Sequence, residues 1–233
     1  MKKNTFLHSG DLGDIIYSLP TIKRLGGGIL YLNPASNSTV KDYPIKTKLS
    51  IAAINSLRPI LAMQEYIDDV LIWNGENPDY NLDLFRSNIR FNNLAISHMD
   101  ALGINEVKIE NQWITYRNKR QLSKPYLINR SVRYHGNYVE WVKILNIIKD
   151  HSLFIGLPKE HEIFEYTFEV KIPYYPTPTI IDLVETINSC EKIFCNQSFA
   201  HAIAEGLAHP LHCEVFRPYP AAVFANKVTS QYF

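Results

Sequence analysis

Short apolar runs alternate with segments of helical periodicity along the whole chain, and this alternation restricts the fold more than any other feature of the sequence. Near the N-terminus, a helix is predicted at Ile15–Arg24 between two predicted strands, Thr5–His8 and Ile29–Leu32. A strand, a helix and a second strand in this order form a unit whose strands run parallel. The sequence therefore predicts an α/β protein with parallel sheets, not a β-sandwich or a helical bundle.

The same alternation continues to the end of the chain. In the first half we expect a helix at about Thr47–Met63, strands at Asp69–Trp73 and Tyr80–Leu84, and a short helix at Leu94–Leu102. In the second half we expect strands at Tyr126–Asn129, Leu153–Ile155, Lys192–Cys195 and Leu211–Phe216, and helices at Tyr138–Lys149, Lys159–Tyr166, Ile180–Ser189 and Ser198–Leu207.

The segment Tyr116–Pro125 divides the two series of elements. It is polar and basic and ends in proline, which is typical of a linker. A chain of 233 residues has the length of two domains of about 110 to 120 residues each. We therefore predict two Rossmann-like domains that face each other, at residues 1–118 and 119–233.

Composition excludes several classes of protein. With 46% hydrophobic and 20% charged residues, the chain is neither disordered nor a coiled coil. No apolar run approaches the ~18 residues of a membrane helix, and Lys2 and Lys3 precede a polar stretch, so we expect a cytoplasmic protein. Three cysteines without a CxxC pair favour free thiols. The net charge of +1 hides a basic stretch at 108–149, which could attract phosphate groups or form a solvated face.

The loop after the first predicted strand contains Gly10, Asp11, Gly13 and Asp14. Glycine lets the backbone approach a ligand closely, and open α/β sheets bind ligands at the carboxyl ends of their strands. Gly10, Asp11 and Gly13 are therefore candidate binding positions, and Asp14, in the first turn of the next helix, is a candidate for chemistry. The alternative is helix capping, because an Asp at a helix N-terminus satisfies free N–H groups.

A second polar turn, Asn196-Gln197-Ser198, joins a predicted strand to a predicted helix. Asn196 or Ser198 can cap that helix, and the N–H groups and positive dipole end there form a natural diphosphate site. His201 and Glu205 lie four residues apart and share a helix face, so Glu205 could bind a ribose hydroxyl or pair with His201. The alternative is an ordinary capped helix in which His201 is a packed or a surface histidine.

A third candidate loop follows the predicted strand at 126–129. Arg130, Ser131 and Arg133 lie there, and the two arginines could neutralise a diphosphate or could be surface residues. His209, His212 and Cys213 lack a fourth ligand at regular spacing, so we expect no metal site. The motifs of serine hydrolases, P-loop NTPases, zinc proteases and simple dinucleotide oxidoreductases are absent.

Several of these blocks together resemble the heptosyltransferase-type glycosyltransferases of family 9. Gly13-Asp14 and Ser18-Leu19-Pro20 match, in order and spacing, the Gly-Asp and Thr/Ser-Leu-Pro of that family. Asn196-Gln197-Ser198 stands where the family has Asp-Thr-Gly, and His201 matches the histidine that follows. The stretch from Gly156 to Glu160 resembles the family's Gly-x-x-x-Glu, in which the acid reaches the nucleotide. The changed Asp-Thr-Gly element and the short length indicate a divergent member.

The resemblance implies a GT-B fold and an inverting, metal-independent transfer of a sugar from a nucleotide-diphosphate sugar to an acceptor hydroxyl. It implies that Asp14 is the general base, that the N-terminal domain binds the acceptor, and that no cofactor is needed besides the nucleotide-sugar co-substrate. The donor would bind the C-terminal domain through the candidates Arg130, Ser131, Arg133, Gly156, Glu160, Asn196, Gln197, Ser198, His201 and Glu205.

Two other functions stay open at the level of the sequence. One is a non-catalytic module that binds a nucleotide or sugar. The other is a GT-B-like nucleotide-sugar epimerase, for which His8 and His135 are the additional acid–base candidates. The acceptor could be a saccharide, a small metabolite, a protein or a modified nucleic acid, because residues 46–110 contain no recognisable motif.

Overall fold

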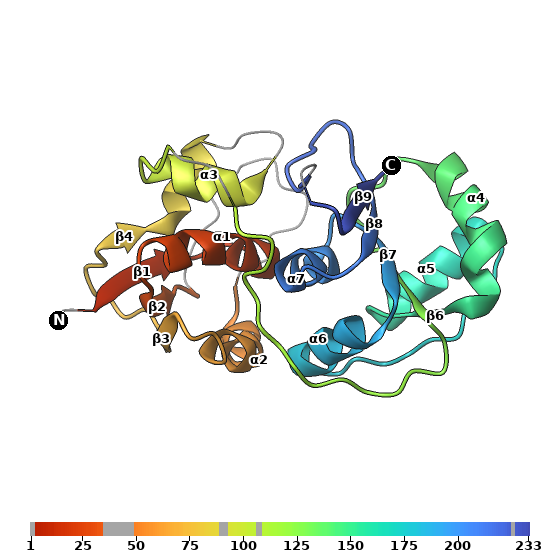
Figure 1. The fold of residues 1–233 in the computed structure, drawn as a ribbon, viewed down its shortest axis with the longest axis horizontal. Coiled ribbons are helices and arrows are strands. Elements are labelled where there is room, and N and C mark those ends of the chain that lie inside the picture. The colour runs from red at the N-terminus through yellow and green to blue at the C-terminus, as the bar shows by residue number, and fades with distance from the viewer. Residues whose placement is uncertain (1–2, 35–48, 89–92, 106–108, 225–226) are drawn as a thin grey trace. The chain divides into compact units, whose positions relative to one another are not determined.

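The computed structural model describes residues 3–34, 49–88, 93–105, 109–224 and 227–233. The chain forms two compact units, Met1–Thr115 and Tyr116–Phe233 (Figure 1). The division falls at the start of the segment predicted as a linker, close to the predicted boundary at residue 118. Each unit contains one parallel sheet with helices between its strands, which confirms the predicted α/β class.

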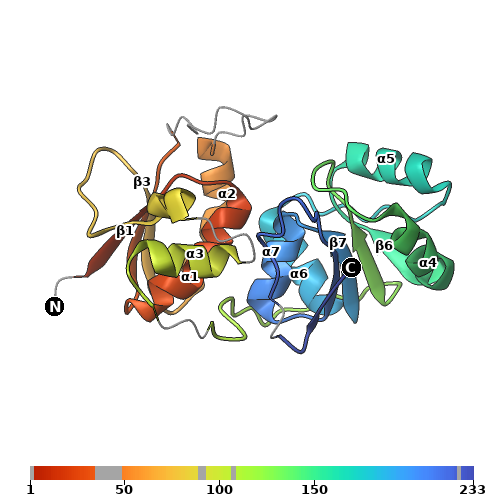
Figure 2. The ribbon, with the colours of Figure 1, turned by 90° about the horizontal axis from the view of Figure 1, so that it is seen from above.

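The first unit is built on a sheet with strand order β3-β2-β1-β4. Helices α1 and α3 lie side by side in this unit (Figures 1 and 2). Four apolar side chains of α1 are fully buried, those of Ile15, Ile16, Leu19 and Ile22. The elements are β1 (Asn4–His8), α1 (Leu12–Arg24), β2 (Gly28–Leu32), α2 (Ile51–Ala62), β3 (Ile67–Ile72), β4 (Tyr80–Asn81), the 3₁₀ helix η1 (Leu82–Asn88) and α3 (Leu94–Ala101).

The second unit is built on a sheet with strand order β6-β5-β7-β8-β9. Its elements are β5 (Tyr126–Asn129), α4 (Tyr138–Ile148), the 3₁₀ helix η2 (Lys149–His151), β6 (Ser152–Phe154), α5 (Pro158–Phe168), α6 (Ile180–Ser189), β7 (Lys192–Asn196), α7 (Phe199–Leu207), β8 (Leu211–Glu214) and β9 (Ser230–Tyr232). Figure 2 shows α6 and α7 on one face of this sheet and α4 and α5 on the other. Trp141, Phe154 and Phe164 belong to the buried core cluster.

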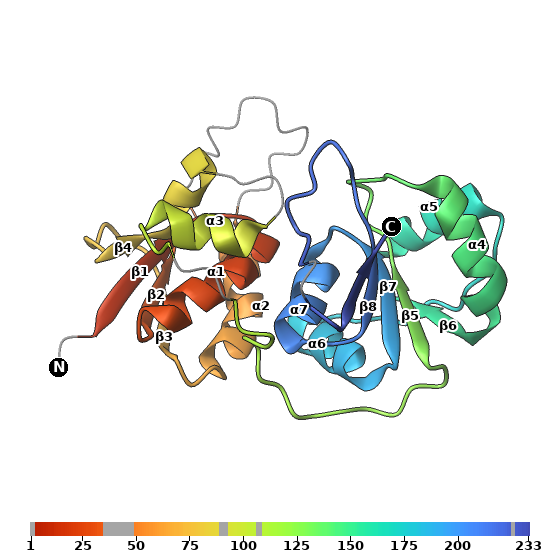
Figure 3. The same ribbon diagram turned by 45° about the horizontal axis from the view of Figure 1, so that its top comes forward.

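Every strand pair in both sheets is parallel, so the carboxyl ends of all strands in a sheet meet at one edge. In the first unit this edge carries His8 and the loop that leads into α1. In the second unit, β5, β7 and β8 lie next to one another (Figure 3) and end in Asn129, Asn196 and Glu214. The predicted loops are therefore gathered by the topology of each sheet.

The structure differs from the predicted elements in several details. Only Tyr80–Asn81 pairs as a strand, because the Asn81 side chain accepts a hydrogen bond from the Asp83 N–H and the chain turns into η1. β8 ends at Glu214, since the Phe216 N–H donates to Gln197 instead of a strand. β9 was not predicted. The helix predicted at 47–63 begins at Ile51, with Ser50 as its N-cap, and residues 47 and 48 lie outside the described residues.

The three cysteines are buried free thiols. None of the helices in the described ranges combines the length and the hydropathy that a bilayer-spanning helix needs.

Candidate functional site

Asp14 lies in the first turn of α1, directly after the loop that follows β1, and two local features define its position. Asp11 is the N-cap of α1, and the Asp14 carboxylate accepts a hydrogen bond from the Asp11 N–H at 3.3 Å. A Cβ on Gly10 would lie 2.5 Å from the His8 ring and 2.9 Å from Asp14 Oδ2, so only glycine fits there. The Asp14 side chain is 23% exposed. Asp14 therefore makes the capping contact while its side chain stays partly exposed to solvent.

Two residues that sequence reasoning missed, Asp83 and Arg86, lie beside Asp14. Asp83 accepts hydrogen bonds from the N–H of Ser9 at 3.0 Å and from the Ser9 hydroxyl. Arg86 Nη1 donates to Asp83 Oδ1 at 2.8 Å, and Arg86 Nη2 lies 3.8 Å from Asp14 Oδ2. Asp83 thus anchors a guanidinium next to the predicted general base. The sequence feature that could have identified them is their position directly after β4, because β4 is the neighbour of β1 in the sheet.

His8 and His98 form a buried pair beneath the same loop. His8 Nδ1 accepts a hydrogen bond from the Gly10 N–H at 2.9 Å, and His98 Nδ1 lies 2.7 Å from the Leu94 carbonyl, to which it must donate. The Nε2 atoms are 3.1 Å apart, so the remaining proton is on His8 and points to His98. Burial lowers the pKa of His8 to about 4, although the charge of Asp83 opposes this shift. Burial and His8 also lower the pKa of His98. Both rings are neutral at pH 7.

In the second unit, Asn196 joins the end of β7 to the loop after β5. Its carbonyl oxygen accepts hydrogen bonds from the N–H and the hydroxyl of Ser131, at 3.0 and 3.3 Å. Its amide nitrogen donates to the carbonyls of Ser131 and Arg133. A carboxylate could not donate to those carbonyls, so the amide at this position fits its surroundings.

Ser198 and Gln197 complete the turn before α7. Ser198 is the N-cap of α7; its hydroxyl accepts from the His201 N–H at 3.4 Å and donates to Asn129 at 2.7 Å. The Gln197 amide donates to the Tyr219 carbonyl and accepts from the Phe216 N–H. The polar turn therefore connects three neighbouring loops at the carboxyl edge of the sheet, with the N-terminus of α7 among them.

Gly156 and Glu160 lie after β6, at the same edge of the sheet. The Glu160 carboxylate accepts from the Leu157 N–H at 2.8 Å, which is a helix-capping contact at the start of α5. Burial raises the pKa of Glu160, and this shift is opposed by the N–H groups of Leu157 and Val132 and by the charge of Arg133. The Arg133 guanidinium also lies 5.5 Å from the centre of the Tyr134 ring. The positive charge of Arg133 therefore acts on the Glu160 carboxylate.

Arg130 occupies a different position from its neighbour Arg133, because it is buried against Glu214. Arg130 Nε and Nη2 donate to the two oxygens of Glu214 at 2.8 and 3.1 Å. Glu214 also accepts from the N–H groups of Gly136 and Asn137 and from the Trp141 indole. Burial alone would raise the pKa of Glu214, but the bonds and charge of Arg130 hold it below its usual value. Sequence reasoning missed Glu214, whose partners are distant in the chain.

Glu205 pairs with His201, as one of the two predicted alternatives proposed. His201 Nε2 lies 3.5 Å from Glu205 Oε1, and both side chains are fully buried. Lys227 Nζ lies 3.2 Å from Glu205 Oε2, and the Tyr232 hydroxyl donates to Glu205. Burial would raise the pKa of Glu205, but His201 and Lys227 hold it below its usual value. This carboxylate is committed to partners inside the second unit.

Three further histidines and one cysteine contact neighbouring groups of the second unit. Cys190 Sγ lies 3.2 Å from His209 Nε2, and the His212 ring contacts Phe233. The His135 Nε2 atom lies 2.6 Å from the Ser131 carbonyl. Within the ranges that the structure describes, no three His, Cys, Asp or Glu side chains come together as a group that could hold a metal ion.

Solved structures resemble this chain over nearly its whole length. The family 9 glycosyl transferase from Veillonella parvula matches 99% of this chain and 85% of its own, with a TM-score of 0.62 and 11% identity. The E. coli heptosyltransferase WaaC with ADP-2-deoxy-2-fluoro heptose matches 100% and 93%, with a TM-score of 0.63 and 9% identity. The chain has the fold of the family 9 glycosyltransferases.

A third structure, the E. coli ADP-heptose lps heptosyltransferase II, matches 100% of this chain and 90% of its own, with a TM-score of 0.52 and 12% identity. No family model and no curated sequence matches the chain. The predicted GT-B-like, heptosyltransferase-like architecture is thus confirmed as a fold, with the sequence divergence that the changed turn at Asn196 indicated.

Proposed function

We propose that this protein is a glycosyltransferase that moves a sugar from a nucleotide-diphosphate sugar to an acceptor hydroxyl. The observation that carries the proposal is the combination of the family 9 fold with a part-exposed Asp14 carboxylate at the carboxyl end of β1. Glycosyl transfer needs a general base for the acceptor hydroxyl, and a carboxylate within reach of solvent can supply one.

In the proposed reaction, Asp14 takes the proton of the acceptor hydroxyl while its oxygen attacks the anomeric carbon. The bond between that carbon and the diphosphate oxygen breaks, and the nucleoside diphosphate leaves with the electron pair. Displacement in one step inverts the anomeric carbon, and no step uses a metal ion. The acceptor is assigned to the first unit and the donor to the second.

On the donor side, the N-terminus of α7 offers N–H groups and the positive end of a helix dipole for the diphosphate. Ser198, Gln197 and Asn196 form the turn around that terminus, with Ser131 bonded to Asn196. Of the two arginines of the loop after β5, Arg133 is assigned to the leaving group, because Arg130 is buried and paired with Glu214. Gly156 and Glu160, at the end of β6, are assigned to the nucleoside. His201 and Glu205 are assigned to holding α7, since both are enclosed.

The test begins with binding of the donor. Purified protein is screened for thermal stabilisation by nucleoside diphosphates and nucleotide-sugars, beginning with ADP and ADP-sugars, since two of the similar structures contain ADP or an ADP-heptose analogue. A ligand at 100 times its Kd stabilises the folded state by about 2.7 kcal/mol. We expect one nucleoside diphosphate and its sugar to raise the Tm, and no stabilisation by any nucleotide would contradict the donor assignment.

The variant Asp14→Asn then separates catalysis from binding. We expect it to bind the donor as the wild type does and to lose transfer by at least about a hundredfold, the usual range for a general base. A non-catalytic module is the second candidate, favoured by the capping bond between Asp14 and the Asp11 N–H. If the protein is such a module, the wild type and Asp14→Asn both bind the nucleotide and neither transfers a sugar.

A further inference from the structure

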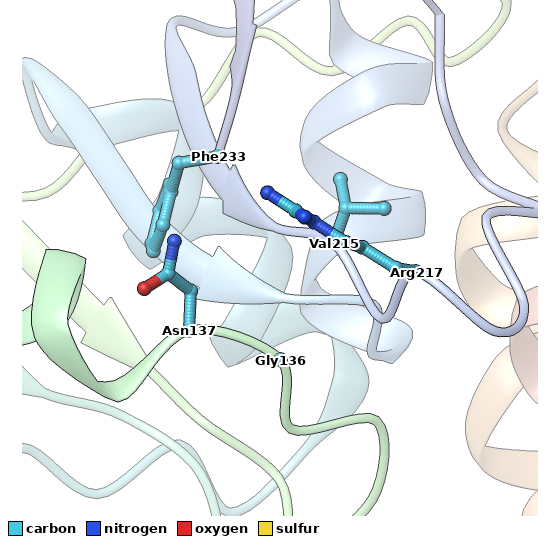
Figure 4. A pocket seen from close by; sticks show the side chains of 5 residues that line it. All are labelled: Gly136, Asn137, Val215, Arg217 and Phe233. Atoms are coloured by element: carbon cyan, nitrogen blue, oxygen red, sulfur yellow. The ribbon is translucent and has the colours of Figure 1, made fainter.

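A hollow of about 280 Å³ opens at the surface of the second unit. It is lined by Gly136 and Asn137, which precede α4, by Val215 and Arg217, which follow β8, and by Phe233, which follows β9 (Figure 4). None of these residues belongs to the turn before α7. The hollow nevertheless adjoins the residues assigned to the donor, because Gly136 follows Arg133 in the loop after β5 and the N–H of Phe216, between Val215 and Arg217, donates to Gln197. The ligand inferred for this hollow is not the nucleotide-sugar, and the test of it uses no nucleotide.

Arg217 supplies the positive charge of this hollow. Its side chain is exposed, and Figure 4 shows it extending toward the Phe233 ring. Among the residues that the structure describes, no carboxylate forms a salt bridge with Arg217. The five N–H donors of a guanidinium are arranged to hold phosphate or carboxylate through two parallel bonds.

Asn137 adds a neutral donor. Its carbonyl oxygen already accepts a hydrogen bond from the Glu140 N–H at 3.1 Å, as the N-cap of α4. The amide nitrogen is consequently the free part of this side chain, and Figure 4 shows it on the side of Phe233. Both polar side chains of the hollow thus offer donors, which suits a ligand that carries acceptor oxygens.

The nearest buried carboxylate, that of Glu214, does not cancel this charge. Glu214 is fully buried and forms an ion pair with Arg130, so its charge is matched inside the unit. The N–H groups of Gly136 and Asn137 also donate to it, so the hollow does not depend on free N–H groups of a helix terminus.

The walls of the hollow are held by packing. The Phe233 ring packs against the Trp141 ring, with centres 5.7 Å apart, and against the His212 ring, with centres 4.7 Å apart. A Cβ on Gly136 would lie 2.4 Å from the Val215 carbonyl, so the loop before α4 passes directly over the end of β8. The hollow is thus bounded by an anchored aromatic ring and a close backbone contact.

We propose that this hollow binds an oxyanion, phosphate or carboxylate, that is free or is borne by a ligand about the size of a monosaccharide. Its volume of about 280 Å³ lies just below the range of roughly 300 to 1,000 Å³ for small-molecule pockets, which is too little for a whole nucleotide-sugar. Arg217 binds the oxyanion, Asn137 donates to one of its oxygens, and the face of a sugar ring would pack against Phe233.

The test is a titration of the full chain followed by NMR of the arginine Nε–Hε groups. Three probes are added separately: inorganic phosphate, glucuronate, and glucose as the neutral control. We expect phosphate and glucuronate to shift the Arg217 signal and glucose to leave it unchanged. Tighter binding of glucuronate than of phosphate identifies a sugar-borne anion, and the reverse order identifies free phosphate.

Arg217→Gln is expected to weaken anion binding by about tenfold or more, the loss of one charge-assisted contact. Arg117→Gln, at an exposed arginine of the same unit, is the matched control and is expected to bind as the wild type does. Arg217→Lys keeps the positive charge but lacks the paired N–H donors of the guanidinium, so we expect an intermediate affinity. It serves as the test if the glutamine variant does not fold. Saturation by no anion, or equal affinity in Arg217→Gln and the wild type, would overturn the proposal.

Discussion

The substitution Glu214→Gln removes the acceptor on which one region of the second unit converges. The Glu214 carboxylate accepts from Arg130 Nε at 2.8 Å and Nη2 at 3.1 Å, from the N–H groups of Gly136 and Asn137 at 2.7 and 2.9 Å, and from Trp141 Nε1 at 2.8 Å. A glutamine has one carbonyl oxygen, and its NH₂ group would face other donors. It would also leave the guanidinium of Arg130 buried without a counter-charge.

The expected loss follows from that last effect. Removing one partner of a buried ion pair typically costs about 3 to 5 kcal/mol, because the other charge stays buried and uncompensated. Arg130 and Glu214 are 7% and 0% exposed, so solvent does not replace the lost partner. We therefore expect Glu214→Gln to lower the free energy of unfolding of the second unit by about 3 to 5 kcal/mol.

Urea unfolding at pH 7 measures this loss, with the indole N–H resonance of Trp141 as the local probe. The pKa of Glu214 is held below its ordinary value, so its contribution to stability is complete above the unfolded pKa of about 4.3 and is lost as the pH falls through the folded pKa. Glu162→Gln is the control: Glu162 is 64% exposed and pairs with Lys159 at the surface, so we expect less than about 0.5 kcal/mol. A loss for Glu214→Gln no larger than the control would refute the reasoning.

Three further predictions concern the loops. Because burial lowers the pKa of His8 to about 4, the unfolded chain binds more protons than the folded chain below about pH 6.5, and the free energy of unfolding should fall from there toward pH 4. His8→Gln should make this fall smaller when urea unfolding is compared at pH 7 and pH 5. An unchanged fall would contradict the neutral pair of His8 and His98. Asn196→Asp should lower the free energy of unfolding by about 1 to 3 kcal/mol, because a carboxylate would face the carbonyls of Ser131 and Arg133. A neutral or stabilising effect in thermal unfolding would count against this account. Ser198→Ala should lower the free energy of unfolding by about 1 kcal/mol through loss of the α7 N-cap. Ser50→Ala, at the N-cap of α2, is the matched comparison. If Ser50→Ala is measurably destabilised and Ser198→Ala is not, the Ser198 cap does not stabilise α7.

The regular elements could be predicted because each follows a local period. Helix α6 has the predicted bounds Ile180–Ser189, since Thr179 caps it and its apolar positions recur at helical spacing. β9 could not be predicted in this way, because three residues, Ser-Gln-Tyr, are too few for any period. Its pairing with β8 is decided by packing in the folded unit.

The candidate site was predictable as a set of loops but not as a set of contacts. The glycines and Asp14 were identified from the turn between strand and helix, whereas Arg86 and Asp83 reach them from a segment far along the chain. Arg130 was predicted to meet a diphosphate, and the structure pairs it with Glu214. Nothing local in either sequence segment marks that pair, because both partners are charged residues of a kind that usually stays at the surface.

The strand order of the second unit has a consequence for how the chain folds. β5 pairs with β6 on one side and with β7 on the other, yet the two helices α5 and α6 are synthesised between those partners. While the ribosome is still making them, β5 has one side unpaired, and an unpaired strand edge is a template for association with other chains. Parallel pairings of this kind also form slowly, because distant segments must meet first. Slower expression at low temperature should therefore improve the yield of folded protein.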